Sequence, residues 1–111
     1  MPANTQISGT PSANPNTMSL SSPQDVWFEW SLNNSGDEDD TTTGWYFMIT
    51  DPAGTWIDSQ YAPDDTVAVG QTNQQGGKIE ASTFTTAGTW WIMLKAPSGD
   101  SVGGATVEVT Q

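Results

Sequence analysis

The sequence predicts an all-β fold: a single antiparallel β-sandwich preceded by an extended N-terminal arm. Apolar and polar residues alternate with a period of two in several short segments, and β-branched and aromatic residues dominate those segments. Proline and glycine turns separate the segments at short intervals, and no segment shows the 3.6-residue period of a helix. A length of 111 residues allows one domain. Strand count alone leaves both an immunoglobulin-like and a jelly-roll-like topology open.

The predicted domain boundary separates an arm, residues 1–17, from a sandwich, residues 18–111. The arm is rich in Pro, Gly, Asn and Thr, and Ile7 is its only large aliphatic residue. It lacks the basic and apolar regions of a secretory signal peptide. We expect it to have no regular structure of its own and to lie extended on a neighbouring subunit, with Ile7, Pro11 and Pro15 as attachment residues.

The first half of the sandwich is predicted to contain three strands. Residues 25–33 and 44–50 alternate cleanly between apolar and polar side chains, and the acidic, polar run 33–44 connects them. Residues 51–54, Asp-Pro-Ala-Gly, form a turn in which proline fixes φ at the second position. The returning strand of this hairpin covers residues 55–61.

The second half is predicted to contain four further strands. A short strand spans residues 66–69, and the glutamine-rich run 71–77 is interpreted as a loop. Strands follow at 78–84 and at 89–95, and the second of these is so apolar that both of its faces should be covered. The last strand is predicted at 105–110.

The apolar phase of these strands predicts the hydrophobic core. Its twelve members are Val26, Phe28, Trp30, Leu32, Trp45, Phe47, Ile49, Trp90, Ile92, Leu94, Val107 and Val109.

Two segments resemble known modules. The hairpin GWYFMITDPAGTWIDS, residues 44–59, and the strand AGTWWIML, residues 87–94, are similar to small β-sandwich modules of secreted prokaryotic proteins, of the pre-peptidase C-terminal type and the adhesion-related immunoglobulin-like type. The resemblance covers roughly residues 25–110. It implies a sandwich fold and an accessory or adhesive role, and it carries over no catalytic residue.

A free-standing sandwich with an arm also resembles the decoration or turret proteins on tailed-virus capsids. On this analogy we expect a structural virion protein, made in the host cytoplasm and displayed on the virion surface. Its partners would be other capsid subunits, in a homo-oligomer or a larger assembly. The alternative is a carbohydrate-binding or adhesive cell-surface module.

Composition argues against several other classes of function. The chain has no cysteine and no histidine, and Lys78 and Lys95 are its only cations against thirteen acidic residues. The net charge of −11 disfavours nucleic acid and anionic membranes as partners. Glu29 and Glu80 are the strand carboxylates considered for acid–base catalysis, but both fall on the polar phase. We therefore expect neither an enzyme nor a bound cofactor.

Two constellations are candidates for binding. Trp27, Trp56 and Trp91 fall out of phase with the core, so they predict an aromatic face that stacks on sugars or docks on another subunit. Asp37, Asp39 and Asp40 are candidate calcium ligands. Because their run lacks the spacing of a dedicated calcium loop, the sequence favours a solvated loop tip instead. The pair Asp64-Asp65 is interpreted as a turn.

Overall fold

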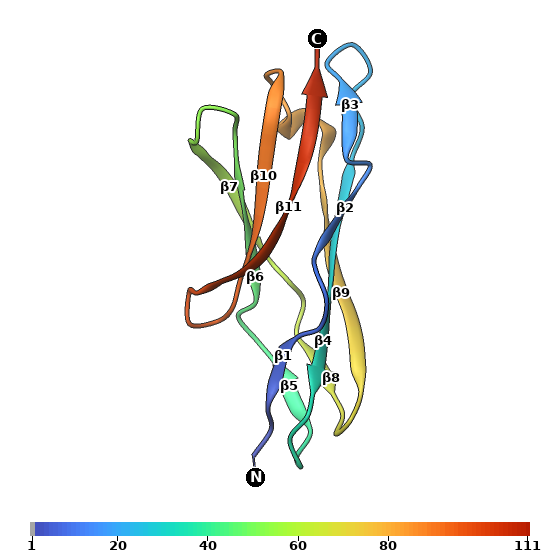
Figure 1. Cartoon of the computed structure of the whole chain (residues 1–111), viewed down its shortest axis with the longest axis vertical. Coiled ribbons are helices and arrows are strands. Elements are labelled where there is room, and N and C mark those ends of the chain that lie inside the picture. Colours follow the sequence, from blue (N-terminus) through green and yellow to red (C-terminus); the bar gives the residue numbers. More distant parts are fainter. Residues whose placement is uncertain (1) are drawn as a thin grey trace.

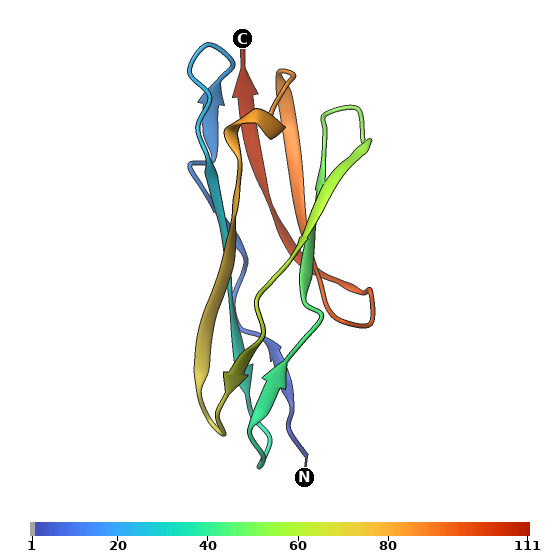
Figure 2. The ribbon, with the colours of Figure 1, turned by 180° about the vertical axis from the view of Figure 1, so that it is seen from behind.

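Two β-sheets face each other along the long axis of the molecule, as the computed structural model shows (Figures 1 and 2). The structure describes residues 2–111, which measure 51 × 21 × 19 Å, with the two termini at opposite ends of the long axis. The all-β prediction is confirmed, because the only helical element among the described residues is the single 3-10 turn η1 (Ala81–Thr83). Within residues 2–111, no helix is long and apolar enough to cross a membrane.

The first sheet is built around one long strand. Strand β4 (Val26–Asn34) pairs with β9 (Thr72–Ile79) over nearly its whole length. It also pairs with two short strands, β1 (Thr5–Ile7) and β2 (Ser12–Asn14). All of these pairings are antiparallel.

The second sheet has five strands in the order β3-β11-β10-β6-β7. Their bounds are β3 (Thr17–Ser19), β11 (Ser101–Thr110), β10 (Gly88–Lys95), β6 (Tyr46–Thr50) and β7 (Trp56–Tyr61). The pairings are antiparallel except that β3 runs parallel to β11. A separate two-stranded ribbon, β5 (Asp40–Thr42) with β8 (Asp65–Val67), lies near the N-terminal end of the molecule (Figure 1).

The core fills the space between the two sheets. Phe28 and Trp30 of β4 contact Phe47 of β6, with ring centroids 5.1 and 5.9 Å apart. All twelve residues of the predicted core are buried, so that prediction is confirmed. Buried residues outside the predicted set include Met18, Ala62, Val67, Ile79 and Phe84.

The N-terminal segment differs from its prediction. An arm without regular structure was expected, but β1, β2 and β3 pair with strands of their own chain. The reason is that β4 would otherwise leave one row of backbone amides and carbonyls without partners. Pro2 precedes β1, and Pro11 and Pro15 lie between the short strands, so no ladder hydrogen bond is required of any of them.

Two of the three residues predicted to attach the arm, Ile7 and Pro11, contact other parts of their own chain. Ile7 pairs in register with Leu32 and packs against the core. Pro11 is buried beside Gly103, where an added Cβ would lie 2.9 Å from the proline ring. Pro15 follows β2 through a cis peptide bond.

Three further secondary-structure predictions are wrong. The run 71–77 was expected to be a loop and 78–84 a strand, yet β9 covers Thr72–Ile79 and the chain then enters η1. Polar residues suit β9 because only its Gln75 and Ile79 are buried. Gly76 leaves room for the neighbouring strand, since a Cβ there would lie 2.7 Å from the Phe28 carbonyl oxygen. The polar connection 33–44 also contains a strand, β5.

Candidate functional site

An array of aromatic and methionine side chains covers the outward face of the five-stranded sheet. Trp91, Trp56 and Tyr61 are exposed by 52, 60 and 72%, and three neighbours are half-buried. We call this surface the aromatic face, and its members are Tyr46, Met48, Trp56, Tyr61, Trp91 and Met93.

The two tryptophans of the aromatic face stand in one row across the sheet. Trp91 on β10 pairs with Thr50 on β6, and Thr50 pairs in turn with Trp56 on β7. Adjacent strands are about 4.8 Å apart, so the two tryptophan backbones are separated by roughly 9–10 Å. A β-bulge between Ile49 and Thr50 brings Trp56 into this row.

The rest of the aromatic face continues along the strands. Met93 and Met48 pair in the next outward row, and the Met93 side chain lies over Gly104. Tyr46 and Tyr61 occupy the row beyond, with ring centroids 5.2 Å apart. The face is therefore an open aromatic surface rather than a pocket.

Trp27 is not part of this surface. It projects from the outward side of β4 in the other sheet, where it alternates with buried Val26 and Phe28. Since the two sheets face each other, their outward sides point in opposite directions. The structure thus brings together two of the three predicted tryptophans and places the third, also 52% exposed, on the far side.

Few charged groups lie on the aromatic face. Lys95 pairs in register with Tyr46. Its Nζ donates a hydrogen bond of 2.5 Å to Ser101 Oγ. Glu108 accepts a hydrogen bond of 2.7 Å from Thr89 Oγ1. The hydroxyl groups of Thr50 and Thr106 flank Trp91 in its row. The surface therefore offers stacking and hydroxyl contacts with little charge.

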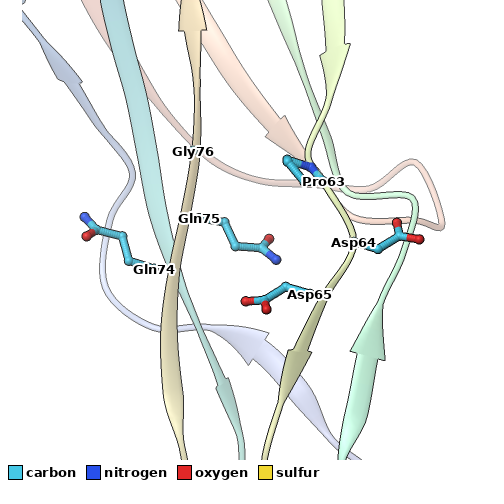
Figure 3. Close-up of a pocket in the computed structure, with 6 residues that line it drawn as sticks. All are labelled: Pro63, Asp64, Asp65, Gln74, Gln75 and Gly76. Atoms are coloured by element: carbon cyan, nitrogen blue, oxygen red, sulfur yellow. The ribbon is translucent and has the colours of Figure 1, made fainter.

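A second candidate lies at the edge of the sandwich, where β9 faces the segment that leads into β8 (Figure 3). This cavity of about 320 Å³ is called the edge cavity, and its lining residues are Pro63, Asp64, Asp65, Gln74, Gln75 and Gly76. In Figure 3, Gln75 and Asp65 extend toward each other across the gap, whereas Asp64 and Gln74 point away from it.

Hydrogen bonds fix which way the Gln75 amide points. The Thr42 hydroxyl donates its one proton to the Asp65 carbonyl over 3.2 Å, so it can only accept from Gln75. Gln75 Nε2 donates to Thr42 Oγ1 over 3.0 Å. The carboxamide oxygen is therefore on the side away from Thr42, and it has no hydrogen-bond partner.

The cross-strand neighbour of Gln75 carries a complementary unpaired atom. Trp30 pairs in register with Gln75, and its indole Nε1 also has no hydrogen-bond partner. Both side chains are more than nine-tenths buried. This register pair therefore leaves one acceptor and one donor unsatisfied. A buried polar atom without a partner costs about 1–3 kcal/mol.

The acidic loop does not assemble as a metal site. Asp39 Oδ1 accepts a hydrogen bond of 3.0 Å from the Val69 amide, and Asp40 lies in β5. Across residues 2–111, no three carboxylates come close enough together to hold a metal ion. The two carboxylates considered for catalysis belong to neither candidate site. Glu29 lies on the outward side of β4. Glu80 forms an ion pair, with its Oε1 3.6 Å from Lys78 Nζ.

Sequence reasoning missed the edge cavity. Gln75 was assigned to a loop and Asp65 to a turn, because glutamine-rich and Asp-Asp runs are usually solvated. The only local signal was the pair of glycines after Gln75, which is unusual in a loop that packs against nothing.

Neither a family model nor a curated protein sequence matches the chain. Solved structures share its fold. The DNA glycosylase AlkC of Pseudomonas fluorescens, bound to DNA with an abasic-site analogue, superposes with a TM-score of 0.75 at 13% identity. The β-glucosidases EmGH1 of Erythrobacter marinus and 3B of Thermotoga neapolitana, the latter in complex with glucose, give TM-scores of 0.76 and 0.71 at 12% identity.

These neighbours are much larger than this chain. Between 97 and 100% of the chain is covered, against 32% of the glycosylase and 16% of each glucosidase. At such low identity the likeness shows the fold alone.

Proposed function

We propose that this chain is a non-catalytic β-sandwich module, of the immunoglobulin-like type, that binds a neutral polysaccharide through the aromatic face. The observation that carries the proposal is the row formed by Trp91, Thr50 and Trp56. Two exposed indoles about two strand spacings apart suit stacking on alternate sugar rings of one extended chain.

The chemistry around the row supports a sugar over other ligands. Stacked pyranose rings present apolar faces to the indoles and hydroxyl groups to Thr50 and Thr106. A net charge of −11 disfavours anionic polymers, which leaves neutral or cationic chains. The resemblance in fold to small parts of two β-glucosidases is compatible with an accessory module of this kind.

The test is retention of the protein on insoluble neutral polysaccharides. We expect cellulose, chitin or xylan to deplete the protein from solution, and Trp91→Ala and Trp56→Ala each to weaken retention about tenfold or more, since truncating a central aromatic contact costs 1 kcal/mol or more.

The matched control is Trp27→Ala, because Trp27 has the same 52% exposure as Trp91 but lies on the opposite sheet. This variant should be retained like the wild type. An equal loss of retention for Trp27→Ala, or no retention of the wild type by any of the three polymers, would overturn the proposal.

A capsid-decoration role stays a prediction. It was favoured by an arm free to reach a neighbouring subunit, and that segment pairs with its own chain. In that role the aromatic face would be the attachment surface, and Trp91→Ala would abolish fixed-stoichiometry copurification with particles while sugars had no effect.

A further inference from the structure

We infer that the edge cavity is a second sugar-binding site, which accepts a single sugar ring and satisfies Gln75 Oε1 with one of its hydroxyl groups. The ligand class is that of the proposed function, on which this inference therefore rests. The evidence for the site is separate, because none of the cavity-lining residues belongs to the aromatic face.

The unpaired atoms define what the ligand must offer. Gln75 Oε1 requires a donor, and the Thr42 hydroxyl cannot supply one because its proton is already given to the Asp65 carbonyl. Trp30 Nε1, on the register partner of Gln75, requires an acceptor. Opposed side chains of such a pair have Cβ atoms about 4.5–5.5 Å apart. A hydroxyl group both donates and accepts, so the hydroxyls of a sugar can satisfy an atom of either kind.

The cavity lining offers a further hydrogen-bond acceptor for sugar hydroxyls. The Asp65 carboxylate points into the gap, and its Oδ2 accepts a hydrogen bond of 3.1 Å from Asn73 Nδ2. A carboxylate beside a carboxamide can accept from neighbouring hydroxyls of one ring. The volume of about 320 Å³ is at the small end of ligand sites and suits one ring rather than a chain.

Access to the inner atom requires a small movement. Gln75 Oε1 has almost no surface exposed to solvent, so a hydroxyl reaches it as the ligand displaces the wall formed by residues 63–65. Pro63 and Asp64 of that wall precede β8 and belong to no strand, whereas Asp65 is the first residue of β8 and is held by Thr42 and Asn73. Binding should therefore change the surroundings of Gln75 and Trp30 together.

The experiment is a titration of the whole chain with D-glucose, D-galactose and N-acetyl-D-glucosamine, followed by nitrogen-15 NMR. We expect at least one sugar to produce saturable shifts of the Gln75 side-chain amide and the Trp30 indole N–H. The same shifts should persist in a Trp56→Ala/Trp91→Ala variant. Absence of shifts for all three sugars, as when a bound water already occupies the position, would overturn the inference.

Variants locate the contact. Gln75→Leu should raise the dissociation constant about tenfold, the equivalent of one buried hydrogen bond. Because that change can also affect folding, Asp65→Asn provides a second measure and should weaken binding several-fold. Asp58→Asn removes the same charge at an exposed position outside the cavity lining and should leave binding unchanged. Equal effects of the two asparagine variants would overturn the assignment.

The two proposals fail in distinguishable ways. If the protein is not retained on polysaccharides but still shows the monosaccharide shifts, the aromatic face is rejected as a binding site and the edge cavity is supported. If the protein is retained on polysaccharides but shows no monosaccharide shifts, only the proposal of a binding site in the edge cavity is rejected. Shifts that vanish in the Trp56→Ala/Trp91→Ala variant would show that the cavity does not bind independently.

Discussion

Among single residues, Asn34 joins the end of β4 to three other parts of the chain. Its Oδ1 accepts from the amides of Asn4 and Gly36, at 3.1 and 3.0 Å. Its Nδ2 donates to the carbonyls of Glu38 and Val67, at 2.7 and 3.0 Å. The side chain is completely buried and satisfied at every position. It therefore ties the N-terminal segment, the acidic loop and β8 to the end of β4.

Replacing Asn34 with alanine should be strongly destabilising. The change leaves two amides and two carbonyls without their partner, and we expect a loss of about 2–4 kcal/mol in the free energy of unfolding. Asn33→Ala is the control, since the Asn33 amide bonds only to Gln71 and Thr72 at an exposed site. Urea titration measures both, and a loss below about 1 kcal/mol for Asn34→Ala would contradict the prediction.

Residues whose role depends on local pattern could be predicted, whereas residues whose role depends on distant partners could not. Trp90 and Phe47 were predicted to be buried because each follows its own strand's alternation. Asn34 and Gln75 are also buried, but each depends on a partner about thirty residues away. A polar residue in a polar run carries no local sign of such partners.

Among the elements, the N-terminal segment contributes to the sandwich itself. Strands β1 and β2 cover an edge of β4, and β3 extends the second sheet beside β11. Their short, polar sequences gave no strand signal, because three residues are too few for an alternation to be recognised. Similarly, Trp27 could be predicted to face outward, but the sheet to which β4 belongs could not.

Deleting residues 1–17 should destabilise the fold. The deletion removes β1 and β2, exposes the backbone groups of β4, and deprives Asn34 of its contact with Asn4. We expect a clearly lower melting temperature together with association through the exposed β4 edge, measured by calorimetry and light scattering. An unchanged melting transition in a monomeric deletion variant would show that the segment is only loosely attached.

For the whole molecule, thirteen carboxylates and two lysines make self-repulsion a general cost of folding. Lys78 offsets little of it, because its contacts with Asp25 and Glu80, at 3.9 and 3.6 Å, lie at the surface. Raising the salt concentration from about 0.01 to 1 M shortens the screening length from about 30 to 3 Å. The melting temperature should therefore rise with sodium chloride, by about 4–8 °C for each kcal/mol of repulsion removed.

A charge-altered variant separates this repulsion from general salt effects. Asp58→Lys combined with Asp64→Lys replaces two exposed acids, and each change adds two units of positive charge. With less repulsion to screen, the variant should melt higher than the wild type at low salt and respond less steeply to sodium chloride. Equal salt dependence in the two proteins would mean that ion exclusion, rather than the acidic charge of the molecule, governs its stability.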